Sequence, residues 1–494
     1  MLSARRREWG MAGLICLVTA AVLLLLCSQS SPLYPINIWD DANCLLTVGR
    51  VMRSGGVLYR DVYEQKGPTL YLMHALAACI SDTSFFGVYV VEVISLAAAL
   101  LLAYRLLRRR ASMALALSGA AVLGACVLVS TAFSRGDSAE ELCLPYLMGA
   151  LMLTFDEYGQ REGPMRPARL FVCGLLAGVV ATIKYTILGL FVGLCLCEGV
   201  LAIRRGGLPR ALRSAGVFLA GMLLPVLGWA AYFAANGALA DAYTAYIYNN
   251  IFLYSDSYTL LELARGMAAA FRDNLTWAIP AVAGVAAFCL RGEEPLRLRM
   301  AVLTMAACSF AVVFFLGRTW PYCPLVLSVF AAVGAVELLR LVRLGLARWA
   351  HRTQIWTAVI GVAAGALSLV MAWGMSPNAY LRGVPLGELA QARLAAYVEP
   401  GATLLQYSHL DDGLYLTTGT LPQQKYFVRL NVSFDEMAQE LDRYLEEAIP
   451  DYVLVSWSEL PERFDRYQLI AVDAGYDEQN RINKGFYLYR RKSE

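Results

Sequence analysis

The sequence has 494 residues, of which 58% are apolar and only 16% are charged. A soluble globular protein carries roughly 25% charged residues, so this composition excludes a soluble protein and indicates a chain whose solvent is the lipid bilayer. The formal net charge of +3 is small, and the arginines lie in short groups between apolar segments. This distribution excludes a basic nucleic-acid-binding face, and it indicates which loops lie in the cytoplasm.

The apolar segments predict a polytopic helical membrane protein. About 20 apolar residues are needed to cross a hydrocarbon core of about 30 Å. One of the segments is long enough for two short passes, and a further apolar stretch at 68–81 is short. The predicted spans are 11–27, 84–104, 112–133, 141–156, 170–203 (two passes), 214–235, 274–290, 300–316, 321–341 and 355–373.

The arginine groups between these segments set the orientation, because short arginine-rich loops stay in the cytoplasm. For all of them to face one side, each interval between neighbouring groups must contain an even number of crossings. Segment 68–81 therefore does not cross, segment 170–203 crosses twice, and the predicted total is eleven spans. The N-terminus is expected in the cytoplasm and everything after Trp373 outside. The first span could alternatively be a cleaved signal peptide, which would leave this orientation unchanged.

The first long external loop, residues 28–83, contains the sequence WDDAN at residues 39–43. A helix is predicted over residues 41–53, and a single aspartate at its start would be explained as a helix cap. Asp40 and Asp41 are adjacent, however, so we expect one to cap the helix and the other to face a cavity as a base or a ligand. The apolar stretch 68–81 at the end of the loop is expected to form an interfacial or re-entrant helix.

A dense polar stretch precedes this interfacial helix and contains Tyr59, Asp61, Glu64 and Lys66. Lys66 lies where the chain returns to the bilayer, which is the depth at which a lipid phosphate is found. The alternative is a flanking lysine whose side chain simply extends toward water.

Further external turns add charged residues at the same membrane depth. The second acidic loop, residues 134–141, contains Asp137 and Glu140 and is expected to cap the following helix in part. Lys184 is predicted at the external tip of the 170–203 hairpin. Arg318 and Tyr322 follow in a late external turn, where an arginine suits a phosphate.

From residue 377 to residue 494 the composition becomes polar and predicts a small extracytoplasmic α/β domain. The sequence His409-Leu410-Asp411-Asp412 is interpreted as a solvated loop or a helix cap rather than a catalytic cluster. We expect this domain to bind the acceptor or to cover the site. Its predicted strands are 403–407, 425–428, 452–456, 468–472 and 486–489, with a helix at 434–448.

Several motifs resemble the GT-C class of polyprenyl-phosphate-sugar-dependent glycosyltransferases, in the bacterial branch related to protein mannosyltransferases and the lipid A aminoarabinose transferase. WDDAN resembles the first-loop acidic motif of that class, although Asp41 stands where glutamate is usual. The Lys66-Gly67-Pro68 sequence stands where Lys-Pro-Pro is common. The motifs are WDDAN (39–43), GGVLYRDVYEQKGPTLY (55–71), GDSAEELCLPYLMGAL (136–151), GLLAGVVATIKYTILGL (174–190) and GRTWPYCPLVL (317–327).

The resemblance implies a GT-C-like transmembrane catalytic domain over residues 1–376 and an inverting transferase in the bacterial plasma membrane. It would move a sugar from a polyprenyl-phosphate donor to an extracytoplasmic acceptor. The first-loop base maps to Asp40, with Asp41 as its neighbour or substitute, the phosphate-contacting lysine to Lys66, and the second-loop acid to Asp137 or Glu140. Substrate contacts are expected from the residues of the other motifs: Tyr59, Asp61, Glu64, Lys184, Arg318 and Tyr322.

The alternative function is a transporter or flippase of lipid-linked sugars, which predicts charged residues at mid-membrane; the spans are nearly free of them. No cofactor is required by the sequence. Carboxylates from the two acidic loops could bind a divalent metal, but no spacing demands it. The expected partners are the polyprenyl-phosphate sugar, membrane lipids and the acceptor, without nucleic acid. The donor sugar, the acceptor, the polyprenyl length and the oligomeric state are not encoded in readable motifs.

Overall fold

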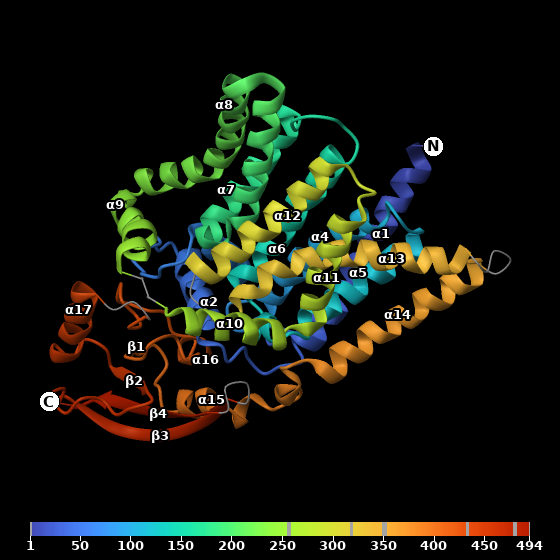
Figure 1. The fold of residues 1–494 in the computed structure, drawn as a ribbon. Coiled ribbons are helices and arrows are strands. Elements are labelled where there is room, and N and C mark those ends of the chain that lie inside the picture. The colour runs from blue at the N-terminus through green and yellow to red at the C-terminus, as the bar shows by residue number, and fades with distance from the viewer. Residues whose placement is uncertain are drawn as a thin grey trace. The chain divides into compact units, whose positions relative to one another are not determined.

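The computed structural model describes residues 2–253, 258–316, 320–347, 353–430, 434–477 and 482–493. The described chain is mostly helical and carries a four-stranded sheet near its C-terminus (Figure 1). It divides into two compact units, each built from separate stretches of sequence. The helical unit comprises Met1–Ser28, Glu92–Gly228 and Ser257–Ala379, and the loop–sheet unit comprises Gln29–Val91, Trp229–Asp256 and Tyr380–Glu494.

The helical unit contains the predicted spans, and each predicted span is helical in the structure. The expected break in segment 170–203 falls directly after Lys184, where α7 ends. The elements are α1 (Leu2–Cys27), α4 (Phe86–Leu107), α5 (Met113–Leu128), η1 (Thr131–Phe133), α6 (Ala139–Tyr158), α7 (Pro167–Lys184), η2 (Tyr185–Ile187), α8 (Gly189–Ala235), α10 (Leu260–Arg272), α11 (Leu275–Arg291), α12 (Leu296–Ala311), η4 (Val312–Leu316), η5 (Cys323–Phe330), α13 (Ala331–Ala347), α14 (Thr353–Met375) and η7 (Ala379–Leu381). Three of the elements, α4, α8 and η7, extend into stretches of the loop–sheet unit, by residues 86–91, 229–235 and 380–381.

A multi-pass membrane architecture is confirmed. Among the described residues, seven helices are long and apolar enough to cross a bilayer, and up to eight if the bent pair α10–α11 counts as one span. This number is smaller than eleven partly because α8 joins two predicted spans in 47 residues, broken by non-helical backbone at Gly206 and Gly207. In addition, α5 has only 16 residues. The total of eleven crossings therefore stays a prediction.

Close helix packing in the helical unit depends on glycine. α11 packs against α13, and a Cβ atom added to Gly284 would lie 2.2 Å from the Cα of Gly334. Small residues at such a crossing let two backbones approach, which is the main source of helix association where lipid removes the hydrophobic driving force.

In the loop–sheet unit, α2 (Asp40–Arg53) packs against α3 (Pro68–Ile80). The 13 residues of α3 are too few to cross a bilayer, as predicted. The crossing of the two helices is again tight, because a Cβ on Gly49 would lie 2.5 Å from the carbonyl carbon of His74. The other helical elements are α9 (Leu239–Ala242), the π-helix η3 (Tyr243–Leu253), η8 (Leu386–Glu388), α15 (Ala390–Ala395), α16 (Leu414–Thr417) and α17 (Asp435–Glu446).

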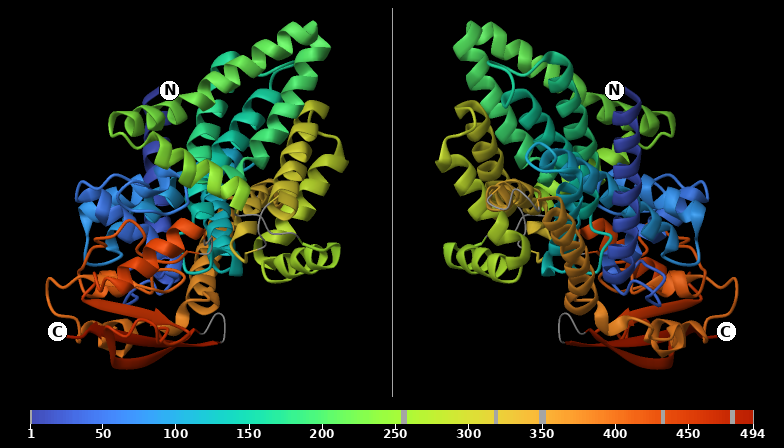
Figure 2. Two further views of the ribbon diagram at one scale, coloured as in Figure 1. Left: turned by 90° about the vertical axis from the view of Figure 1, so that its left-hand side faces the viewer. Right: turned by 90° about the vertical axis from the view of Figure 1, so that its right-hand side faces the viewer.

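The sheet has the strand order β1-β2-β4-β3. β1 and β2 are parallel, with α17 in the connection between them, while β4 is antiparallel to β2 and to β3. Figure 2 shows β3 and β4 as a long curved ribbon. The strands are β1 (Leu404–Gln406), β2 (Tyr452–Ser456), β3 (Tyr467–Asp477) and β4 (Ile482–Arg491).

The predicted strand at 425–428 is wrong. Phe427 and Val428 are buried as a strand would be, but the backbone there finds partners outside the sheet. The Tyr415 hydroxyl donates to the Phe427 carbonyl at 3.2 Å, and the Tyr63 amide donates to the Lys425 carbonyl at 2.8 Å. The apolar run therefore reflects burial in an irregular segment.

The close approach of α11 and α13 at Gly284 allows a test of whether this contact stabilises the fold. We expect Gly284→Ala to lower the thermal unfolding midpoint in lipid nanodiscs, because overpacking a tight contact costs about 1–3 kcal/mol. Gly365→Ala in α14 is the matched control, since nothing lies within 4 Å of a Cβ there. An unchanged midpoint in Gly284→Ala would show that the two helices separate without cost.

Candidate functional site

The two aspartates of the first loop are the first two residues of α2. The N-cap position is Trp39, and no side chain caps the helix, so the expectation that one aspartate is the cap is wrong. Both carboxylates lie in the first turn, where the helix dipole favours negative charge. Their further partners come from two different parts of the loop–sheet unit.

Asp41 pairs with Lys66, whose Nζ lies 2.8 Å from Asp41 Oδ1 and 3.1 Å from Glu64 Oε1. The other oxygen of Glu64 accepts from the Lys66 amide at 3.0 Å, and the Tyr59 hydroxyl donates to the Lys66 carbonyl at 2.6 Å. The lysine is therefore fixed at its backbone and at its ammonium group. With only 15% of its side chain exposed, it does not extend freely to water.

The charge of Lys66 is secured by these neighbours. Burial alone would lower the pKa of the ammonium group, but the carboxylates of Asp41 and Glu64 raise it, so that the pKa lies well above its usual value. Lys66 is a permanent cation at neutral pH. A phosphate that approaches it must compete with two carboxylates.

Asp40 has a separate lysine partner. Lys484 of β4 places its Nζ 2.8 Å from Asp40 Oδ2, and it also forms an ion pair with Asp412. Burial would lower the pKa of Lys484, while Asp412 and Asp40 raise it above its usual value. About a third of the Asp40 side chain is exposed, against 12% for Asp41. Asp40 is thus the more accessible carboxylate of the pair.

The interpretation of residues 409–412 as a solvated loop is wrong for its two acids. Asp411 and Asp412 are buried, and the Thr47 hydroxyl of α2 donates to Asp411 Oδ2 at 2.7 Å. Burial raises the pKa of Asp411, and the hydrogen bond from Thr47 opposes this. His409 is exposed, as expected.

The remaining first-loop residues hold the backbone. Tyr59 is buried with φ at +68°, and its ring packs against Phe233 with centroids 5.4 Å apart. Asp61 pairs with Arg60 at 2.7 Å and accepts from the Val57 amide at 2.8 Å. The Arg60 hydrogen bond lowers the pKa of Asp61. These contacts give both residues a role in shaping the turn before Lys66.

A second cluster lies in the helical unit. Lys184 Nζ is 2.6 Å from Glu140 Oε1 and 5.3 Å from the centroid of the Tyr322 ring, so three predicted site residues come together. Asp137 is buried with φ at +64°, and its amide donates to Glu92 and Glu141 at 3.0 and 2.9 Å.

The helix start at α6 is as expected, because Ser138 caps it by accepting from the Glu141 amide at 3.0 Å. Gly136 precedes this cap with φ at +85°, and a Cβ there would lie 2.4 Å from Ser28 Oγ.

The predicted site residue Arg318 lies outside the described residues.

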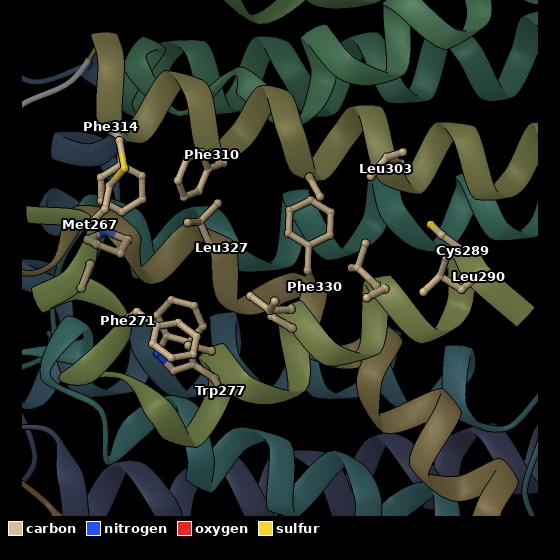
Figure 3. Close-up of a pocket in the computed structure, with 18 residues that line it drawn as sticks. Met267, Phe271, Trp277, Cys289, Leu290, Leu303, Phe310, Phe314, Leu327 and Phe330 are labelled. Atoms are coloured by element: carbon tan, nitrogen blue, oxygen red, sulfur yellow. The ribbon is translucent and has the colours of Figure 1, made fainter. Parts of the chain in front are cut away.

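An apolar pocket of about 570 Å³ is also found in the helical unit. Figure 3 shows side chains of α10, α11, α12, η4 and η5 around one space, among them Phe271, Trp277, Phe310 and Phe330. Such a cavity suits a hydrocarbon chain.

Among the described residues, no group of three or more histidine, cysteine or acidic side chains is placed to hold a metal ion.

No family model matches the sequence, and no curated protein matches it. Among solved structures, the chain is similar to ArnT from Cupriavidus metallidurans in the apo state, with 14% identity, 97% of this chain and 98% of that chain covered, and a TM-score of 0.61. The fold is therefore of the GT-C class. ArnT bound to undecaprenyl phosphate matches with 15% identity, 97% coverage of each chain and the same TM-score.

The archaeal oligosaccharyltransferase AglB from Archaeoglobus fulgidus, in complex with an inhibitory peptide and a dolichol-phosphate, matches less closely. Identity is 10%, the coverage is 90% of this chain and 69% of that chain, and the TM-score is 0.51. The predicted fold class, a GT-C-like helical membrane protein with a small sheet near the C-terminus, is confirmed.

Lys484 and Asp412 are the site residues that sequence reasoning missed. Asp412 was visible as one of two adjacent acids, but Lys484 belongs to a strand with no motif around it. Their ion pair gives a stability prediction: Lys484→Met should cost about 3–5 kcal/mol, because it leaves the Asp412 carboxylate buried without its cation. Adding Asp412→Asn should recover part of this loss.

The measurement is the unfolding midpoint as a function of pH, with the exposed Lys492→Met as the control. Because the pKa of Lys484 is raised, its contribution should be complete below the ordinary lysine value of 10.5 and should disappear only at higher pH. Equal midpoints for Lys484→Met and wild type at neutral pH would contradict the ion pair.

Proposed function

We propose that the protein is an inverting glycosyltransferase of the bacterial plasma membrane, which moves a sugar from a polyprenyl-phosphate donor to an extracytoplasmic acceptor. The observation that carries this proposal is the pair of aspartates at the start of α2, each held by its own lysine. The likeness to ArnT over 97% of the chain supports it, since one ArnT structure contains undecaprenyl phosphate.

Asp40 is the general base in this proposal. A base must reach the proton that it removes, and Asp40 is the more exposed of the two carboxylates. It takes the proton of an acceptor hydroxyl as that oxygen attacks the anomeric carbon of the donor sugar. The bond from this carbon to the phosphate oxygen breaks, the configuration inverts, and polyprenyl phosphate leaves with the electron pair.

A cationic side chain stabilises the departing phosphate in this scheme. Lys66 is a permanent cation in the loop–sheet unit, and a charge held in place before the reaction costs little reorganisation. In the helical unit, Lys184 is held by Glu140 beside Tyr322, and we propose it as a separate substrate contact.

Residues of the C-terminal segment contact the start of α2, where the proposed base lies. Lys484 holds Asp40, and Asp411 accepts a hydrogen bond from Thr47 of α2. These contacts support a role for residues 380–494 in shaping the acceptor side of the site. Point substitutions test that role better than deletion, because deletion would also remove the partner of Asp40.

The function is tested by transfer in liposomes with radiolabelled polyprenyl-phosphate sugars. We expect Asp40→Asn to reduce transfer at least about 100-fold, in line with the loss of a general base. Asp82→Asn, an exposed carboxylate of the same loop that pairs with Arg53, should retain activity. Full activity in Asp40→Asn would refute the assigned base, and label that crosses the membrane unchanged would instead identify a flippase.

The lysine pairs also predict the response to metal removal. Ammonium groups occupy the positions beside Asp40 and Asp41 that a divalent ion would need. Transfer should therefore persist after exhaustive dialysis against EDTA. Loss of activity on dialysis, with recovery on addition of Mg²⁺ or Mn²⁺, would show that a metal displaces these lysines.

A further inference from the structure

A second hollow lies in the loop–sheet unit and has a volume of about 430 Å³; neither Asp40 nor Asp41 lines it. It lies where the parallel strands β1 and β2 end, since Tyr407 and His409 follow β1 while Trp457 and Glu459 follow β2. The space outside the carboxyl ends of parallel strands is the usual ligand position in open α/β sheets. A volume of this size is in the range of small-molecule sites.

Trp457 is held in an unfavourable conformation at this hollow. Its φ is +74°, which is rare for a bulky residue, and the residue is 48% exposed. The backbone is fixed there because the Trp457 amide donates to the Gly485 carbonyl at 2.9 Å. Strained backbone of this kind gathers at binding sites, where it presents a side chain that a relaxed chain would turn away.

The polar lining offers both donors and acceptors. Arg429, which only donates, lies with its guanidinium carbon 4.9 Å from the centroid of the Tyr407 ring. Glu459 only accepts when ionised, and His409 can do either. Sugar hydroxyls donate and accept, so they match this set. The charged group of an anionic ligand would only accept, and it would meet the negative charge of Glu459.

The hollow is also linked to the proposed base. Lys484 Nζ lies 5.6 Å from the centroid of the Trp457 ring and 2.8 Å from Asp40 Oδ2. One lysine thus contacts both the aromatic side chain of the hollow and the carboxylate that we assign as base. A ligand on Trp457 would lie in the same unit as Asp40.

We propose that this hollow binds a neutral sugar ring of the acceptor, with the C–H face of the ring on Trp457 and its hydroxyls bonded to Arg429 and Glu459. The assignment to the acceptor rests on the proposed function, but sugar binding itself does not. An indole ring offers a large apolar face at small entropic cost, which suits the C–H face of a pyranose.

The test is saturation-transfer difference NMR on the full chain in lipid nanodiscs. The probes are the methyl glycosides of glucose, galactose, mannose and N-acetylglucosamine, with glycerol and glucose 6-phosphate for comparison. We expect at least one glycoside to receive more saturation than glycerol. For that glycoside, Trp457→Ala should raise Kd about tenfold, as expected for the loss of an aromatic anchor. Arg429→Gln should also weaken binding, whereas Trp457→Phe should retain it.

Matched controls separate binding from folding. Tyr476→Ala removes an exposed aromatic side chain of β3, and Arg443→Gln an exposed arginine of α17; neither lines the hollow. Both should bind like wild type. The proposal is overturned if no glycoside exceeds glycerol, if Trp457→Ala binds normally, or if glucose 6-phosphate binds more tightly than the methyl glucoside.

The same preparations separate this proposal from the proposed function. Asp40→Asn should keep sugar binding while it loses transfer. A wild-type protein that binds the glycoside but transfers no label would refute the enzyme and leave the sugar site in place. Transfer that continues unchanged in Trp457→Ala would place the acceptor elsewhere.

Discussion

The acidic start of α2 imposes the main constraint on the loop–sheet unit. Two adjacent carboxylates in a half-buried position repel one another, and each is stable only beside its own cation. Lys66 supplies the cation for Asp41 from the end of the same loop, and Lys484 supplies it for Asp40 from a strand near the C-terminus. The close packing of α2 on α3, the buried Asp411 and Asp412, and the antiparallel β3–β4 ribbon all serve to bring these lysines to the helix start.

The two aspartates differ in their surroundings. Asp41 and Glu64 share Lys66 in a nearly closed cluster, whose contacts leave it little freedom to move. Asp40 keeps a third of its side chain open, and its lysine lies against the ring of Trp457. If Asp40 acts on the acceptor and Trp457 binds it, both residues contact the same ammonium group, that of Lys484. A ligand that binds at Trp457 would therefore change the electrostatic environment of Asp40.

Features with strong local signals could be predicted from the sequence. The spans follow from long apolar runs, the break after Lys184 from the positive-inside rule, and β2 from an uninterrupted run of apolar residues. The first-loop acids could be predicted because two adjacent carboxylates exceed what a helix cap needs, and Lys66 because it stands where the chain returns to the bilayer. The pairing of Asp40 with Lys484 could not be found, because its members are 444 residues apart and no local pattern marks the lysine. The segment 425–428 was misread because side-chain burial resembles a strand whether or not a ladder forms.

Asp40 follows α1, whereas Lys484 comes 444 residues later, in β4. During synthesis the ion pair therefore cannot form until β4 has been made. Asp40 lies without this cation throughout that time, and a truncated chain that ends before β4 lacks the contact altogether.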